Sequence, residues 1–275
     1  MALRFTKMHG AGNDFAVVDC RDRPLGLDPG QIARFGNRHF GVGFDQLLTV
    51  EPARDATSAF AYGIYNQDGH GARQCGNGVR CVAAWLHRAG AIGPGVTRLQ
   101  SPSGSVDVEL LDDGRVRAGM GMPEFAPQRI PLRLPAADPY RFHLNHAEVA
   151  FGAVSMGNPH AVIEVDDVEA APLSTVGPAL STAALFPDGA NVGFVQVLDR
   201  GRLRLRVWER GAGATLACGT GACAAAAVLR RRGRIDASVA VELPGGTLQI
   251  DWPGEGHELA MTGPAEFVFE GDYDA

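Results

Sequence analysis

Two segments of the chain repeat one pattern, and their spacing constrains the fold more than any other feature. The first contains Cys75-Gly76-Asn77-Gly78, the second contains Cys218-Gly219-Thr220-Gly221, and each continues into small residues that favour a helix. The two cysteines are 143 residues apart (218 − 75 = 143). A glycine-rich turn that enters a helix exposes unpaired backbone N–H groups and the positive end of the helix dipole. Each segment therefore predicts an anion-binding turn at the start of a helix.

Three further pairs of landmarks recur in the same order along the chain. Their offsets are 143 residues for the first pair and 145 residues for the other two (208 − 65 = 143; 157 − 12 = 145; 191 − 46 = 145). Matches in constant order with so small a drift indicate an internal duplication. We expect two pseudo-symmetric halves related by a pseudo-twofold axis. The pairs are Tyr65-Asn66 with Trp208-Glu209, Gly12-Asn13 with Gly157-Asn158, and Gln46-Leu47 with Asn191-Val192.

The duplicated cysteines indicate a type of chemistry. A thiol at a helix N-terminus should be shifted toward thiolate, because the dipole favours the charged form. If equivalent cysteines face each other across the pseudo-twofold axis, one thiol can remove a proton from a carbon while the other delivers a proton to its opposite face. That is the geometry of a racemase or epimerase. For one such segment alone, a buried structural cysteine is an equally good interpretation.

The order of predicted elements supports two domains of similar plan. Each half is expected to place strands before its cysteine helix and a β-meander after it. Five prolines from Pro123 to Pro139 indicate an extended crossing segment, so the boundary is placed just before it. The tail Ala265–Phe269 has no counterpart in the first half and is expected to cross back and pair with the first domain. The predicted domains are residues 1–120 with 263–275, and residues 121–262.

Composition excludes several functional classes. The net charge of −6 argues against a general nucleic-acid binder, and the longest apolar runs are too short to span a bilayer. Five cysteines without secretory features suggest a reducing cytoplasm. The chain contains no CxxC pair, so a zinc site is not expected. Lys7 is the only lysine and has no pocket motif around it, which argues against pyridoxal phosphate. We expect no cofactor and no metal.

These residues resemble the diaminopimelate epimerase family. The matching motifs run in the family's order across nearly the whole chain: MHGAGNDF, GVGFDQLL, YNQDG, QCGNGVRC, SMGNPHAV, ANVGFV, ERGAG and ACGTGA. The resemblance implies a cofactor-independent isomerase that interconverts LL- and meso-2,6-diaminopimelate. It also implies a mixed α/β (α+β) fold of two pseudo-symmetric domains, each a curved, mostly antiparallel sheet around a central helix, often in a homodimer.

The resemblance also implies roles for individual residues. Cys75 and Cys218 would be the two acid/base thiols, tuned by His160 and Glu209. One departure concerns Ala214, which stands where the family usually has glutamate, and a changed local hydrogen bond is expected there. The implied substrate-binding residues are Asn13, Gln46, Asn66, Asn158, Asn191, Glu209 and Arg210 at the distal end, and Gly76, Asn77, Gly219 and Thr220 at the reacting carboxylate.

Four alternatives remain open from the sequence. A proline or hydroxyproline racemase-like enzyme would share the duplicated fold and the two cysteines, but its small ligand has no second amino-acid end. A PhzF-like isomerase would lack the cysteine pair. A non-catalytic amino-acid-binding protein would tolerate replacement of either cysteine by serine. A structural disulfide between Cys75 and Cys218 would require an oxidising compartment.

Overall fold

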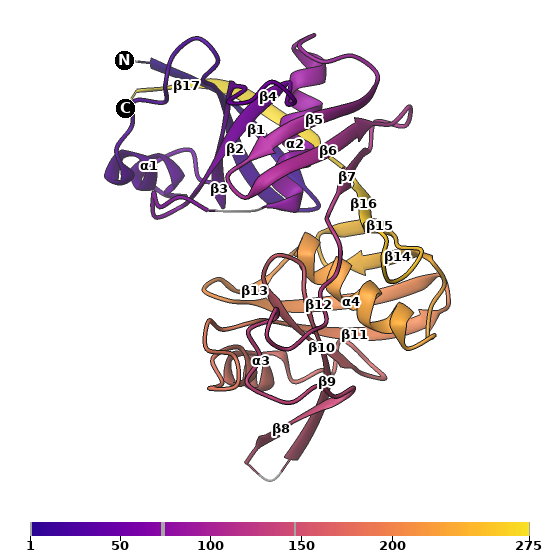
Figure 1. Ribbon diagram of the computed structural model, residues 1–275. Helices are drawn as coiled ribbons and strands as arrows, with labels where there is room; N and C mark the ends of the chain where they lie inside the picture. Colours follow the sequence, from indigo (N-terminus) through magenta and orange to yellow (C-terminus); the bar gives the residue numbers. More distant parts are fainter. Residues whose placement is uncertain (1, 73–74, 146, 275) are drawn as a thin grey trace. The chain divides into compact units, whose positions relative to one another are not determined.

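A computed structural model describes residues 2–72, 75–145 and 147–274 (Figure 1). The chain forms two compact units, of which one is Met1–Gly119 with Thr262–Ala275 and the other is Met120–Met261. We call them unit 1 and unit 2. Both combine β-sheet with helix, as the sequence predicted.

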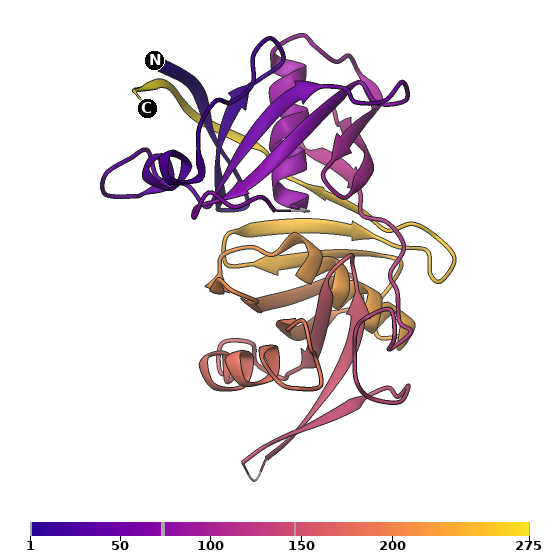
Figure 2. The ribbon, with the colours of Figure 1, turned by 60° about the vertical axis from the view of Figure 1, so that its left-hand side comes forward.

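In unit 1 the strands pair in the order β17-β1-β2-β3-β4-β5-β6-β7. Among these pairings of the described strands, only β2–β3 and β4–β5 are parallel, so the sheet is mostly antiparallel. Helix α2 packs its buried residues, such as Val79 and Val82, against the sheet core that includes Phe15 and Leu48 (Figure 2). The bounds are β1 Ala2–Gly10, β2 Asn13–Asp19, α1 Pro29–Gly36, β3 Gln46–Pro52, β4 Phe60–Asn66, α2 Gly76–Arg88, β5 Gly95–Ser101, β6 Gly104–Leu110, β7 Val116–Gly119 and β17 Glu266–Asp274.

Unit 2 has the same plan. Its described strands pair in the order β8-β9-β10-β11-β12-β14-β15, with β13 added to β12. Of these pairings, only β10–β11 and β12–β14 are parallel. Helix α4 is buried along Gly219–Leu229, where its alanines allow close packing. The bounds are β8 Tyr140–Leu144, β9 Ala147–Ser155, β10 Pro159–Glu164, α3 Leu173–Ser181, β11 Asn191–Asp199, β12 Arg202–Glu209, β13 Gly213–Thr215, α4 Gly219–Arg231, β14 Ser238–Leu243 and β15 Gly246–Asp251; β16, Ala260–Gly263, leads back to unit 1.

The predicted duplication is confirmed in the registers of the strands. In the parallel pair β2–β3, Phe15 lies opposite Gln46, and in β10–β11, His160 lies opposite Asn191. Both members of the second pair follow those of the first by 145 residues (160 − 15 = 145; 191 − 46 = 145). Helices α2 and α4 each have 13 residues and begin 143 residues apart (219 − 76 = 143). Each cysteine helix thus follows the same arrangement of strands.

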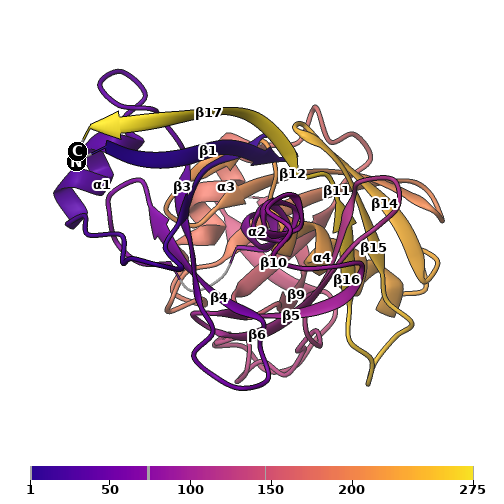
Figure 3. The same cartoon turned by 90° about the horizontal axis from the view of Figure 1, so that it is seen from above.

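The tail completes the sheet of unit 1. Strand β17 pairs antiparallel with β1 from Ala2↔Asp274 to His9↔Glu266, and Figure 3 shows the two strands side by side. The expectation that the tail pairs with the first domain is therefore correct, and the strand runs five residues beyond the predicted Phe269. Strand β8 was not predicted, because it directly follows the proline-rich segment. Among the described residues, no helix has the length and apolar character needed to cross a membrane.

Candidate active site

Cys75 is the N-cap of α2. Its backbone is extended (φ −149°, ψ 104°), and its Sγ accepts a hydrogen bond from the Gly78 N–H at 3.3 Å. A side chain at Gly78 would be crowded, because its Cβ would lie 3.3 Å from the same sulfur. The glycine therefore lets the first helical turn close onto the thiol. The cysteine is half-buried and forms no disulfide.

A chain of amides leads from Cys75 into the unit. The Sγ donates to Asn13 Oδ1 at 3.8 Å, and Asn77 Nδ2 donates to the same oxygen at 3.2 Å. Asn77 Oδ1 in turn accepts from Nη2 of Arg80, a completely buried guanidinium, at 3.0 Å. The structure therefore brings together three predicted site residues, Cys75, Asn13 and Asn77, and adds Arg80 behind them.

Gln46 and Asn66 form a second polar pair in unit 1. They lie opposite each other on β3 and β4, and Gln46 Nε2 donates to Asn66 Oδ1 at 2.9 Å. Gln46 is half-buried and Asn66 is exposed. Gln46 begins β3 and Asn66 ends β4, so the two side chains lie at the same end of this strand pair.

Cys218 is the N-cap of α4, but its side chain makes no cap hydrogen bond and its thiol has a different partner. Its Sγ donates to Glu209 Oε2 at 2.9 Å, and the other carboxylate oxygen, Oε1, accepts from Thr215 Oγ1 at 2.6 Å. Thr220 Oγ1 lies 3.7 Å from the sulfur. Cys218 is only 4% exposed, so its thiol has little contact with water. Glu209, Cys218 and Thr220 of the predicted site thus come together, and Gly219, between Cys218 and Thr220, is buried.

The direction of the thiol shift at Cys218 corrects the prediction from sequence. Helix position predicted a shift toward thiolate, but burial, the Glu209 charge and the hydrogen bond to Glu209 raise the pKa of Cys218 well above its usual value. The Thr220 hydroxyl and the Gly221 N–H act in the opposite direction and are outweighed. Cys218 is therefore a neutral thiol near pH 7 in this arrangement.

The remaining predicted residues of unit 2 form two further pairs. His160 is buried, and its Nε2 lies 3.0 Å from Asn158 Oδ1. Burial and the Arg210 charge lower the pKa of His160 to about 3, so its ring is neutral at physiological pH. Asn191 Oδ1 accepts from the Arg210 N–H at 2.8 Å, which ties the start of β11 to the end of β12.

Besides Arg80, two further residues that contact the predicted site were not named as site residues from the sequence. Thr215 binds Glu209, and the Asp45 carboxylate accepts from Asn13 Nδ2 at 2.8 Å. Thr215 follows Ala214, which is exposed and pairs across the strands with Trp208. Asp45 lies inside the GVGFDQLL motif and Thr215 lies two residues after the ERGAG motif, so their positions in and beside these motifs were the available signal. Within the described residues, no three His, Cys, Asp or Glu side chains converge as metal ligands would.

Sequence comparison decides between the enzymes that could use such a fold. The diaminopimelate epimerase sequence model matches residues 5–126 and 152–268. The chain belongs to the diaminopimelate epimerase family. A diaminopimelate epimerase of Xanthomonas euvesicatoria pv. vesicatoria is 54% identical over 274 residues, which cover 99% of this chain and 96% of the relative. One of Chromobacterium violaceum is 49% identical over 275 residues and all of both chains.

Solved structures extend the likeness in fold beyond the diaminopimelate epimerase family. A probable proline racemase from Agrobacterium radiobacter has a TM-score of 0.72 at 16% identity and covers 99% of this chain and 93% of that one. A PhzF-family phenazine biosynthesis protein of Bacillus anthracis has a TM-score of 0.71 at 14% identity, with both chains covered completely. At these identities the likeness shows a shared fold only. The family assignment rests on the sequence matches.

Proposed function

We propose that this chain is a cofactor-independent epimerase that interconverts LL-2,6-diaminopimelate and meso-2,6-diaminopimelate. The observation that carries the proposal is the occurrence of a reduced cysteine at the head of each of two equivalent helices, α2 and α4. Each lies in one half of a duplicated chain whose family is that of diaminopimelate epimerases. Lysine biosynthesis and the supply of peptidoglycan precursors are the processes that this reaction would serve.

In the proposed mechanism, Cys75 and Cys218 act on opposite faces of one α-carbon. The cysteine that is thiolate takes the α-proton and becomes a thiol, while the opposite thiol gives its proton to the other face and becomes a thiolate. One proton leaves and one arrives, so the carbon inverts and the enzyme ends with the two cysteines exchanged in charge. General acid–base transfer of this kind contributes about 10²–10⁴-fold in rate.

The helix starts supply the stabilisation that the carbanion needs. Backbone N–H groups of Gly76-Asn77 and of Gly219-Thr220 lie in first helical turns, where N–H groups have no partner within the helix. We assign them to the substrate carboxylate next to the reacting carbon. Donors aimed at developing negative charge often give the largest catalytic effect.

The second amino-acid end of the substrate requires several polar groups. We assign Asn13, Gln46, Asn66, Asn158 and Asn191 to that end, together with Glu209 for its ammonium and Arg210 for its carboxylate. Arginine suits a carboxylate because its guanidinium can donate two parallel hydrogen bonds. His160 and Glu209 are assigned to tuning the thiols, and the neutral Cys218 fits the role of the acid.

The remaining proposals concern organisation. We propose that residues 1–120 with 263–275 and residues 121–262 are the two epimerase domains. We further propose a homodimer that works in the cytoplasm, where five reduced cysteines are stable. Diaminopimelate is the proposed small-molecule partner, with no nucleic acid, membrane, metal or cofactor taking part.

The test is exchange of the α-proton for deuterium with purified, reduced protein in D₂O and no added cofactor. We expect exchange and inversion with LL- and meso-diaminopimelate, and none with proline or hydroxyproline. Cys75→Ser and Cys218→Ser should each lower kcat/KM by about 10²–10⁴-fold. Cys20→Ser is the control, because Cys20 is a buried cysteine outside the helix starts. Wild-type activity in both serine variants, or inversion of proline instead, would contradict the proposal.

A further inference from the structure

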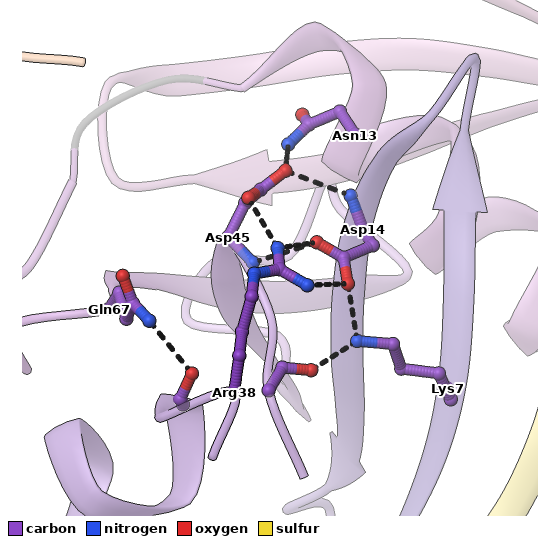
Figure 4. A network of polar contacts seen from close by, with 8 residues as sticks. Lys7, Asn13, Asp14, Arg38, Asp45 and Gln67 are labelled. Atoms are coloured by element: carbon purple, nitrogen blue, oxygen red, sulfur yellow. Dashed lines mark hydrogen bonds and ion pairs between the residues drawn. The ribbon is translucent and has the colours of Figure 1, made fainter. Parts of the chain in front are cut away.

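The Asp45 carboxylate lies between the candidate site and a group of charged side chains. Its Oδ2 accepts from Asn13 Nδ2 at 2.8 Å and from the Asp14 N–H at 3.2 Å, and its Oδ1 accepts from Arg38 Nη2 at 2.8 Å. Figure 4 shows Asp45 with the Asn13 amide on one side and the Arg38 guanidinium on the other. Asp45 directly precedes Gln46, so the carboxylate is fixed where β3 begins.

The contacts of Asn13 give its amide one orientation. At one end of the amide chain, Arg80 has only donors and therefore binds the oxygen of Asn77, which turns the Asn77 NH₂ toward Asn13. At the other end, the Asp45 carboxylate has only acceptors and therefore binds the NH₂ of Asn13. The Asn13 oxygen is left facing Cys75 Sγ at 3.8 Å. A flipped Asn13 would place oxygen against carboxylate and NH₂ against NH₂.

Asp45 is itself held by a compact set of ion pairs. Arg38 Nη2 bonds both Asp45 and Asp14, the latter at 2.7 Å, and Lys7 Nζ bonds Asp14 at 2.5 Å and the Gly43 carbonyl. Burial alone would raise the pKa of Asp14, but the hydrogen bonds from Arg38 and Lys7 outweigh it and lower the pKa to about 2. The Asp45 N–H also donates to Asp14 Oδ1 at 3.0 Å. The Asp14 carboxylate therefore stays ionised at physiological pH, and it joins Lys7, Arg38 and Asp45 in one connected network.

We propose that Asp45 is a positioning residue for the active site: it fixes the Asn13 amide with its oxygen toward Cys75, and the Lys7, Asp14 and Arg38 side chains hold Asp45 in place. The inference rests on the proposed function, because the oriented oxygen acts on the thiol and the ligand bound there. It gives the single lysine of the chain a structural place, connected to Asn13 by three successive hydrogen bonds through Asp14 and Asp45.

The test compares Asp45→Asn with Asp112→Asn, an exposed acid of unit 1, in the full-length protein. An asparagine at position 45 can offer NH₂ or oxygen to Asn13, so the amide loses its fixed orientation. We expect kcat/KM for LL-diaminopimelate to fall about tenfold or more in Asp45→Asn and to stay within twofold of wild type in Asp112→Asn. The ¹H–¹⁵N side-chain amide signal of Asn13, assigned from its loss in Asn13→Ala, should move only in the former.

Three results would overturn the proposal. The first is wild-type kcat/KM in Asp45→Asn, and the second is a fall in kcat/KM with an unmoved Asn13 signal, since Asp45 would then act by another route. If circular dichroism shows that Asp45→Asn does not fold, Arg38→Gln is measured in the same way, because the Arg38 side chain is half exposed. The third overturning result is an Asn13 amide signal that does not move in Arg38→Gln. The Asn13 amide signal is recorded without substrate. If the wild type were inactive, the proposed epimerase activity would be refuted, and the orientation of the Asn13 amide could still be tested.

Discussion

Glu209 distinguishes the two cysteines more than any other single residue. One oxygen of its carboxylate accepts a hydrogen bond from the Cys218 thiol, and the other accepts one from the Thr215 hydroxyl. The duplicated position in unit 1 is Asn66 (209 − 66 = 143), an uncharged side chain that accepts from Gln46. A nearby negative charge disfavours a thiolate. Of these two duplicated positions, only the one in unit 2 carries such a charge.

Replacement of Thr215 should test how Glu209 is held. Thr215→Val removes the hydroxyl and keeps the shape, so the carboxylate loses one hydrogen bond and can turn away from Cys218. A hydrogen bond to a charged group contributes about 1.5–3 kcal/mol, and we expect kcat to fall about tenfold or more. Thr215→Ser keeps the hydroxyl and should retain most activity. Equal activity of the two variants across pH 6–9 would show that the contact has no role.

The buried His160 should make stability depend on pH. Its folded-state pKa of about 3 lies below the ordinary value of 6.5, so between these values the unfolded chain binds a proton that the folded protein does not. The contribution of the neutral His160 to the free energy of unfolding is therefore present in full above pH 6.5, and it is lost as the pH decreases toward 3. Wild type should lose up to about 3 kcal/mol more than His160→Gln between pH 6.5 and 4, measured by urea denaturation at each pH. Parallel curves would contradict the depressed pKa.

At the scale of elements, helices α2 and α4 each have a glycine at their third position, Gly78 in α2 and Gly221 in α4. At Gly221 an added Cβ would lie 3.2 Å from Cys218 Sγ and 3.1 Å from a Val207 methyl, and at Gly78 it would lie 3.3 Å from Cys75 Sγ. Each glycine therefore allows close approach of the helix to its own thiol. Alanine would favour the helix by roughly 0.5–1 kcal/mol but would crowd the sulfur.

Gly221→Ala should therefore separate activity from stability. The gain in helix propensity and the crowding oppose each other, so the free energy of unfolding should change by about 1 kcal/mol or less. A displacement of the thiol by a few tenths of an ångström should lower kcat by about tenfold. Gly93→Ala is the matched control, because a Cβ there meets nothing within 4 Å. Retained kcat with a normal melting temperature would show that the thiol tolerates the contact.

The elements also show what sequence reasoning could reach. Helices α2 and α4 and their spacing were predictable because small residues follow a repeated Cys-Gly turn. Strand β8 was not, since Pro123–Pro139 masks the start of a strand at Tyr140. At the site, the residues of the motifs were named, and their roles stay predictions. The predicted direction of the Cys218 pKa shift was wrong. The helix dipole can be inferred from the sequence, whereas burial and the Glu209 contact, which raise the pKa, arise only on folding.

At the scale of the whole chain, unit 1 is discontinuous and unit 2 is not. Strand β17 covers the outer edge of β1, with Phe269 edge-on to Phe5 and Tyr273 stacked on Phe35 at 4.4 Å. Arg4 and Arg88 both pair with Glu270. The first 119 residues alone would therefore leave an open strand edge and uncovered aromatic rings.

Fragments should reflect this difference. We expect residues 120–261 to unfold cooperatively when expressed alone, because that unit contains its own core. Residues 1–119 should aggregate or remain unfolded, and joining residues 262–275 to them through a glycine–serine linker should restore a cooperative transition. Circular dichroism melting curves of the three fragments provide the measurement. Independent folding of residues 1–119 would show that the tail is dispensable.

The equal strand registers of the two halves carry a consequence for ancestry. A gene of half this length would have encoded one copy of the strand–helix plan, and two identical polypeptides would have supplied identical sulfurs. In a single fused polypeptide the two copies can differ, as Asn66 and Glu209 do at the duplicated position. A descendant with unlike halves can recognise a molecule whose own two ends differ in handedness.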